Sequence, residues 1–392
     1  MLNTQLPSWP SFTQEEADAV SHTLLSNKVN YWTGNECREF EKEFAVWCGT
    51  EHAIALANGT VALDIALKAL NIGQGDEVIV TSRTFMASVS CIITAGATPV
   101  FADVNRDSQN ITAATITPMI TPRTRAIICV HLAGWPCEMD EIMQLAIAHD
   151  LYVIEDCAQA HGAMYKGRMV GSIGHIGSWS FCQDKIMTTG GEGGMVTTND
   201  HHLWSKMWSY KDHGKSWVAV YEQQHPSGFR WLHNSFGTNW RMMEMQAVIG
   251  RIQLNRMRHW TTQRQDHANN IWETARQLLG LRVPTIPAYI THAAYKCYVF
   301  VEPDQLNLGW DRDRIMTEIN RQGIPCFSGS CSEVYLEKAF DHTNWRPNKR
   351  LSIAKELGET SLMFLVHPTL TSSHIEQTCQ TLRRVMHLAV KN

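Results

Sequence analysis

The sequence lacks several features that mark membrane, secreted or nucleic-acid-binding proteins. It has no uninterrupted apolar stretch near the roughly 18 residues that a membrane-spanning helix needs. Residues 1–10 show neither the basic start nor the apolar core of a secretory leader. The formal net charge is only -4, which argues against nucleic acid as a partner. We therefore expect a cytoplasmic protein that binds neither nucleic acid nor membrane.

Cysteine is present but shows no pattern. The 11 cysteines are scattered singly, without a CxxC motif, and Cys326 and Cys331 form the closest pair. No cysteine and histidine are spaced as zinc ligands are. We expect reduced, buried cysteines and no metal site.

Between residues 53 and 155, short apolar segments alternate with helical ones. This spacing is typical of right-handed crossovers in an α/β fold with a mostly parallel sheet and helices on both faces. Ligands of such sheets bind at the carboxyl ends of the strands. The predicted strands are 53–56, 77–80, 99–103, 125–131 and 151–155, and the predicted helices between them are 60–70, 86–95 and 138–149.

The rest of the chain follows other patterns. Residues 1–50 read as mostly helical, and residues 200–237 as a long irregular excursion rich in Trp, His and Lys. A long helix is expected from Asn239 to about Leu279, and an α+β pattern follows it. We expect an N-terminal and large α/β domain, residues 1–260, and a smaller C-terminal α+β domain, residues 261–392.

Three features at predicted strand ends carry chemistry. Asn58-Gly59-Thr60 precedes a helix, where it can serve as an ordinary N-cap or bind phosphate. Asp156 ends a strand, where it can cap the next helix or pair with a cationic ring nitrogen. Lys185 follows the next strand along the chain, where it can be solvated or form a Schiff base with an aldehyde.

In this order the three features match the needs of pyridoxal 5'-phosphate (PLP). The cradle would anchor the phosphate, the carboxylate would keep the ring nitrogen protonated, and the lysine would hold the aldehyde and move protons. Phe85 also follows a strand, where it could stack on the ring or pack in the core.

The chain resembles the DegT/DnrJ/EryC1/StrS family of PLP-dependent sugar aminotransferases, which have the fold-type I architecture of aspartate aminotransferase. The resemblance covers nearly the whole chain. Its motifs are Tyr31-Trp32-Thr33-Gly34, Ala57 to Leu63, Gly75-Asp76-Glu77-Val78, Glu155 to Gly162, Ser180-Phe181 with Lys185, Gly191-Glu192-Gly193-Gly194 and Asn239-Trp240-Arg241-Met242.

The resemblance implies a role for each matching residue. Lys185 would be the catalytic Schiff-base lysine, Asp156 would pair with the ring nitrogen, and Gln159 would hydrogen-bond the ring hydroxyl. Asn239 would reach the phosphate from a partner subunit, which implies a homodimer with shared active sites. The phosphate and the ring face would otherwise contact Asn58, Gly59, Thr60, Ser180 and Phe85.

The resemblance also implies a transaminase that uses L-glutamate as donor and a keto sugar or sugar acid as acceptor. In detail the chain looks most like the branch that makes 8-amino-3,8-dideoxy-manno-octulosonate, an amino form of the lipopolysaccharide sugar Kdo. Lys211, Lys215 and Arg230 are then candidates to bind the sugar carboxylate, unless they form a solvated loop. Trp32 is a candidate for the lip of the substrate pocket, unless it only packs two helices together.

Two other functions stay open at this point. One is a 4-aminotransferase for a nucleotide-linked 4-keto-6-deoxy sugar, as most family members are. The other is a non-catalytic PLP-binding regulator, which the presence of Lys185 and Asp156 and the acidic net charge disfavour.

Overall fold

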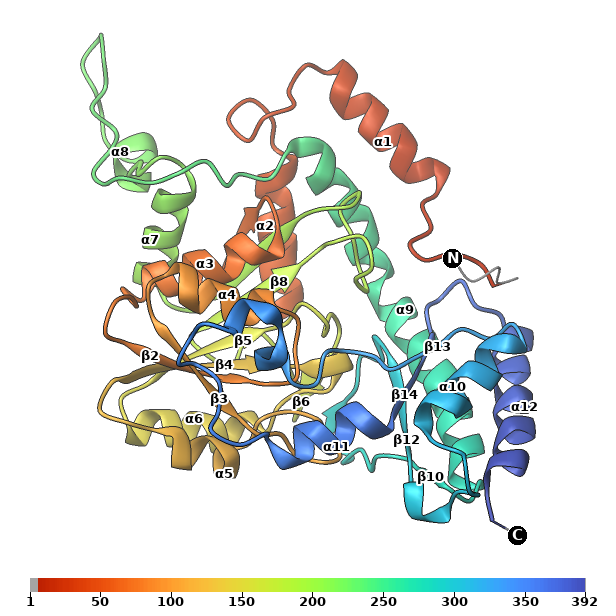
Figure 1. The fold of residues 1–392 in the computed structure, drawn as a ribbon. Helices are drawn as coiled ribbons and strands as arrows, with labels where there is room; N and C mark the ends of the chain where they lie inside the picture. The colour runs from red at the N-terminus through yellow and green to blue at the C-terminus, as the bar shows by residue number, and fades with distance from the viewer. Residues whose placement is uncertain (1–5, 392) are drawn as a thin grey trace.

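The computed structural model describes residues 6–391 and contains a seven-stranded sheet with the order β1-β9-β8-β5-β4-β2-β3 (Figure 1). Strands β8, β5, β4, β2 and β3 pair in parallel, and β9 is antiparallel to both of its neighbours. This confirms the predicted fold class, a mostly parallel sheet in an α/β layer. The strands are β1 (His52–Leu56), β2 (Glu77–Thr81), β3 (Thr98–Ala102), β4 (Thr124–Val130), β5 (Tyr152–Asp156), β8 (Ile176–Ser180) and β9 (Gly194–Thr198).

Helices cover both faces of this sheet, with α3 and α4 on one side and α5 and α6 on the other in Figure 1. Every residue of β2 and β8 is buried, as a doubly covered sheet requires. The crossovers thus bring the ends of β1, β2, β5 and β8 to one edge. The covering helices are α3 (Gly59–Ala69), α4 (Ala87–Thr94), α5 (Ala113–Ile116) and α6 (Met139–Ala148).

The N-terminal helices α1 (Gln14–Leu25) and α2 (Glu36–Cys48) both contact the long helix α9 (Glu244–Arg276). The Thr13 amide and hydroxyl donate to the Glu16 carboxylate in a capping box at the start of α1. These segments are helical as expected.

The prediction of an irregular excursion over residues 200–237 was wrong for its first part. Residues His201–Lys211 form helix α7 and Trp217–Tyr221 form the short helix α8. Asp200 caps α7 by accepting the amides of His202 and Leu203. The polar and aromatic composition hid the buried face of α7. Beyond α8, residues 222–238 form an arm that projects from the body (Figure 1).

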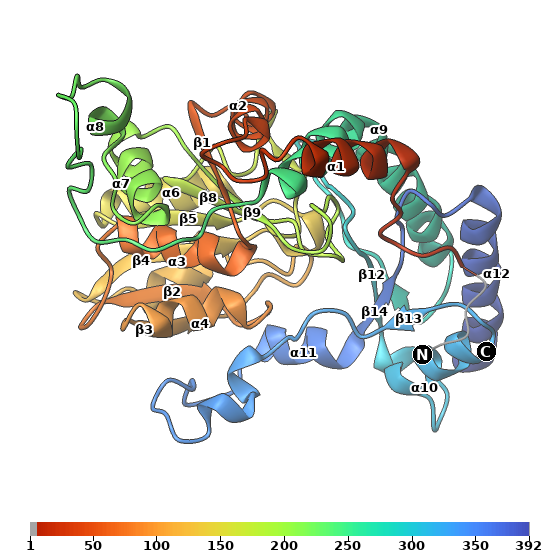
Figure 2. The same ribbon diagram turned by 90° about the horizontal axis from the view of Figure 1, so that it is seen from above.

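The C-terminal part of the chain forms a separate four-stranded antiparallel sheet, with α10 and α12 beside it (Figure 2). Helix α9 continues unbroken across residue 260, so the domain boundary there stays a prediction. The elements are β10 (Leu281–Arg282), β12 (Cys297–Val301), β13 (Cys326–Phe327), β14 (Ser361–Phe364), α10 (Arg312–Arg321), α11 (Ser352–Thr360) and α12 (Ser372–Ala389), and β6 (Met164–Tyr165), β7 (Arg168–Met169) and β11 (Ile290–Thr291) form a small third sheet.

Among residues 6–391, no helix combines the length and the apolar character needed to cross a membrane.

Candidate active site

A cavity of about 840 Å³ opens at the edge where the parallel strands end. Eight of the nine predicted cofactor residues line it: Asn58, Gly59, Thr60, Phe85, Asp156, Gln159, Ser180 and Lys185. The ninth, Asn239, is exposed and does not line the cavity of its own chain. The fold therefore brings together residues that lie up to 127 positions apart (58 to 185).

One end of the cavity is a cradle at the start of α3. Asn58 caps this helix by accepting the Val61 amide at 3.0 Å. The amides of Gly59 and Thr60 lie in the first turn, where no helical acceptor is available to them. A Cβ at Gly59 would lie 2.5 Å from the Cβ of Ser180, so only glycine permits this approach. Free amides, a helix N-terminus and a serine hydroxyl fit a phosphate group.

Asp156 lies at the end of β5, deep in the cavity and only 5% exposed. One carboxylate oxygen accepts the Ser88 hydroxyl at 2.7 Å, and the other accepts the Ala158 amide at 3.1 Å. These two bonds fix the orientation of the carboxylate. The residue is therefore suited to hold the proton of a heterocyclic ring nitrogen.

Gln159 and Phe85 also line the cavity, and their geometry suits a flat ring. The Gln159 Oε1 atom accepts the Ala133 amide at 2.9 Å, which leaves the Nε2 group free to donate into the cavity. Phe85 is 70% exposed although it is a large apolar side chain. Its ring is thus available for stacking and is not part of the core.

Lys185 follows β8 and places its amine in the same cavity, with 15% of its side chain exposed. Its Nζ atom lies 3.7 Å from Asp184 Oδ1 and 5.5 Å from the centre of the Tyr295 ring. Its carbonyl accepts the indole N–H of Trp9 at 2.8 Å. Burial raises the pKa of Asp184, but Lys185 and the Tyr295 hydroxyl outweigh burial and leave that pKa below its usual value. An accessible amine held between fixed neighbours is suited to covalent and proton-transfer chemistry.

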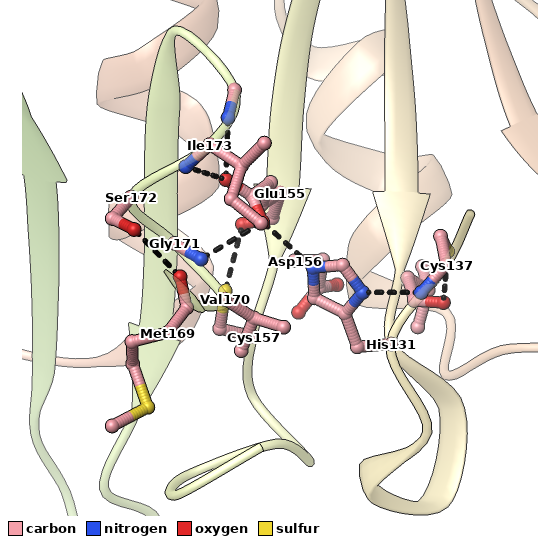
Figure 3. Close-up of polar contacts among 12 residues, drawn as sticks. His131, Cys137, Glu155, Asp156, Cys157, Met169, Val170, Gly171, Ser172 and Ile173 are labelled. Atoms are coloured by element: carbon pink, nitrogen blue, oxygen red, sulfur yellow. Dashed lines mark hydrogen bonds and ion pairs between the residues drawn. The ribbon is translucent and has the colours of Figure 1, made fainter. Parts of the chain in front are cut away.

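Behind Asp156, a buried network holds the strand ends in place (Figure 3). Glu155 accepts the amides of Gly171, Ile173 and Gly174 and also contacts His131 Nε2 at 3.0 Å. Burial raises the pKa of Glu155, but the contact with His131 and the amides of Gly174 and Gly171 together lower it below the usual value.

The tautomer of His131 follows from its contacts. Its Nδ1 atom accepts the Cys137 amide at 3.0 Å, so Nε2 carries the proton and donates to Glu155. His131, Glu155 and Cys157 are close enough to suggest a metal site. However, the hydrogen bonds already use both nitrogens of His131 and both carboxylate oxygens of Glu155. We therefore read this cluster as a structural network.

Sequence reasoning did not assign Ser88, His131, Ala133 or Tyr295. His131 follows β4 at the same edge of the sheet, and its amide donates to the Asp156 carbonyl at 3.1 Å. The rule that residues after parallel strands lie near ligands could have found it. Tyr295 comes from the C-terminal part, and no local signal links it to the cavity.

The predicted substrate residues lie elsewhere in this chain, near α7 and α8, and none lines the cavity. Lys211 is fully buried and donates to Glu41 at 2.9 Å. Lys215 pairs with Asp212 at 3.0 Å and lies 4.1 Å above the Trp32 ring. Arg230 is exposed on the arm. Their roles toward a substrate stay predictions.

Comparisons with known proteins agree with this geometry. The sequence profile of the DegT/DnrJ/EryC1/StrS aminotransferase family matches residues 9–383. The chain is 38% identical to UDP-N-acetyl-3-dehydro-alpha-D-glucosamine 3-aminotransferase of Acidithiobacillus ferrooxidans, over 93% of this chain and 92% of that protein. It is 37% identical to GDP-perosamine synthase of Caulobacter vibrioides, over 96% and 97% of the two chains.

Solved structures give the same result. The aminotransferase from Psychrobacter cryohalolentis superimposes with a TM-score of 0.96 at 63% identity, covering 97% of this chain and 100% of its own. DesV of S. venezuelae superimposes with a TM-score of 0.85 at 31% identity, covering 95% and 94%. The chain therefore belongs to the DegT/DnrJ/EryC1/StrS aminotransferase family, and it is a PLP-dependent sugar aminotransferase.

Proposed function

We propose that the enzyme moves the amino group of L-glutamate to a carbonyl of a keto sugar. The observation that carries this proposal is the convergence of Lys185, Asp156, Gln159 and the Gly59–Thr60 cradle on one cavity. Bound there, PLP supplies an aldehyde that captures the amine and a protonated ring that acts as an electron sink.

The residues around the cofactor would divide the work. Asp156, fixed by Ser88 and Ala158, would hold the proton of the ring nitrogen. Lys185, whose amine faces the cavity, would take a proton from the donor carbon and return one to the sugar carbon. The cradle would keep the phosphate in place during both half-reactions.

The donor is tested with the purified holoenzyme alone. L-Glutamate should bleach the visible absorbance of the bound cofactor without any sugar present. If glutamate has no effect while another amino acid bleaches the enzyme, glutamate is not the donor.

Two acceptors have separate support. The first is 8-oxo-3,8-dideoxy-manno-octulosonate, which would give the 8-amino sugar for lipopolysaccharide. This acceptor is supported by the segments around Lys185 and Lys211, which resemble the family branch that makes that amino sugar. The second is a nucleotide-linked keto sugar. Relatives named for UDP- and GDP-linked sugars, at 38% and 37% identity, favour it.

A competition assay separates these acceptors. The enzyme is first treated with glutamate, which leaves its cofactor aminated. It is then mixed with the octulosonate and with a UDP- or dTDP-linked keto hexose, and the aminated products are identified by mass spectrometry. A product from the nucleotide sugar alone would remove the octulosonate from the proposal.

We also propose that the active enzyme is a homodimer in which Asn239 reaches the phosphate of the partner's site. The arm supports a dimer because it exposes large aromatic side chains, which are typical of a surface that contacts another subunit. Phe229, Trp231 and Phe236 are 77%, 83% and 99% exposed. Asn239 lies at the base of the arm and is also exposed.

Subunit mixing tests the shared site. Lys185→Ala and Asn239→Ala enzymes should each have low activity alone. In an equal, randomly mixed sample about half of the dimers are heterodimers, and one of the two sites in each heterodimer is intact. The mixture should therefore regain about a quarter of wild-type activity. No recovery in a sample shown by light scattering to be dimeric would overturn the shared site.

A further inference from the structure

The side chains that line the cavity carry an unusual balance of charge. Four are carboxylates and two are amines: Asp156, Asp184, Glu192, Glu337, Lys185 and Lys296. An amino acid donor and a nucleotide sugar are both anionic, so the cavity needs a cation beyond the one that holds the cofactor. With Lys185 assigned to the cofactor, Lys296 is the remaining lysine of the lining within residues 6–391.

The backbone of Lys296 is fixed next to the predicted ring site. The amides of Tyr295 and Lys296 both donate to the Ala133 carbonyl, at 2.9 and 3.5 Å. The Ala133 amide in turn holds Gln159 at 2.9 Å. The backbone of Ala133 therefore contacts both the Lys296 segment and Gln159, the residue predicted to contact the ring hydroxyl.

The Lys296 and Lys185 side chains both line the cavity near the ring of Tyr295. The Nζ atoms of Lys296 and Lys185 lie 5.0 and 5.5 Å from the centre of the same Tyr295 ring. The nearby Asp184 carboxylate is engaged by the Tyr295 hydroxyl and by Lys185. In the described part of the chain, no carboxylate lies within ion-pair distance of Lys296.

We propose that Lys296 binds the α-carboxylate of the amino donor. The inference rests on the proposed function. An amino acid carries its carboxylate on the same carbon as its amine, so this anion must lie close to the reacting amine of Lys185. The diphosphate of a nucleotide sugar, or the carboxylate of an octulosonate reacting at its far end, lies several bonds from the reacting carbon. The position of Lys296 thus fits the donor better than either acceptor.

The test compares Lys296→Met and Lys296→Arg holoenzymes, with the exposed Lys349→Met as a matched control. Removal of a charged hydrogen bond should raise the glutamate concentration for half-maximal bleaching about 10- to 100-fold, more than it lowers the maximal rate. Arginine should restore most of the affinity, and Lys349→Met should behave as wild type. Calorimetric titration with 2-oxoglutarate should show the same loss without turnover.

Unchanged affinity of Lys296→Met for glutamate and 2-oxoglutarate would overturn the proposal. So would a loss confined to the reverse half-reaction with the amino sugar, because Lys296 would then serve the acceptor. If wild-type enzyme ignores glutamate but reacts with another amino acid, the donor assignment fails by itself. The Lys296 experiment is then run with that amino acid, and a matching loss of affinity would still support the inference.

Discussion

Two regions of the molecule contain lysines close to aromatic rings, but the lysines differ in exposure and in ion pairing. In the cavity, Lys185 is partly exposed with its nearest acid at 3.7 Å, and Phe85 is 70% exposed. The α7 cluster, beside that helix, is formed by Tyr31, Trp32, Glu41, Lys211, Asp212 and Lys215. In it the amine of Lys211 is fully buried. It lies 2.9 Å from Glu41 and 3.8 Å above the Tyr31 ring.

The difference lies in pairing and access, since the residue types are the same. A buried amine with a close carboxylate and a ring has its interactions satisfied and can stabilise the fold. An amine that faces a cavity beside fixed polar groups can react. The comparison therefore predicts that changes in the cavity affect turnover, whereas changes in the α7 cluster affect stability.

The largest effect is expected for Lys185→Ala. This change removes the amine proposed to react, so turnover should fall about 1,000-fold or more and the visible absorbance of the bound cofactor should change. Lys215→Ala, in the α7 cluster, should keep the wild-type spectrum. An unchanged spectrum in Lys185→Ala would contradict the proposed role of this residue and the predicted difference between the cavity and the α7 cluster.

Asp156→Asn should lower turnover about 100-fold or more while some cofactor binding is kept. The amide no longer favours a protonated ring, although it can keep the contacts to Ser88 and Ala158. Asp212→Asn is the matched control, because Asp212 is also buried and pairs with Lys215 and Arg241. It should lower the melting temperature with less effect on the spectrum. Steady-state rates and absorbance spectra of both variants decide between these outcomes.

Much of the cavity could be predicted from the sequence because parallel strands end at one edge. Asn58, Asp156 and Lys185 each follow a recognisable strand, so their convergence follows from the topology. Some of their local surroundings, such as the glycine beside the N-cap residue Asn58, could also be predicted from the sequence.

What could not be predicted depends on contacts between distant segments. The burial of Lys211 depends on Glu41, 170 positions earlier. Lys296 lines the cavity in a segment whose amides donate to the Ala133 and Gly134 carbonyls, far earlier in the chain. No local periodicity in the sequence indicates either contact. The sequence therefore predicted Lys211 as a substrate-binding candidate and gave no signal for Lys296.

The α7 cluster gives a stability prediction. Lys211→Met leaves Glu41 without its cation in a mostly buried position, and the free energy of unfolding should fall by about 3 kcal/mol. The double variant Lys211→Met/Glu41→Gln should recover part of this loss, because the unpaired charge is gone. Urea unfolding of the two single variants and the double variant gives the coupling energy. If Lys211→Met abolished turnover at full stability, the cluster would belong to the active site.

The smallest effect concerns pH and contrasts a histidine behind the cavity with one on the arm. His161 is fully buried and lies 5.2 Å from the Trp179 ring and 5.6 Å from the Phe181 ring. Among residues 6–391, neither of its ring nitrogens has a hydrogen-bond partner. Burial, followed by Lys185 and Arg264, lowers the pKa of His161 to about 3.

The unfolded chain binds a proton at His161 with an ordinary pKa of about 6.5, whereas the folded protein does not bind it until about pH 3. Stability is therefore complete above pH 6.5 and decreases as the pH falls toward 3, by about 1–2 kcal/mol for this group at pH 5. His161→Phe should shrink the loss between pH 7.5 and pH 5 by that amount in urea unfolding, whereas His233→Phe on the exposed arm should not. An equal loss in the His161→Phe variant would show that the folded protein also binds a proton at this histidine near pH 5, as the unfolded chain does.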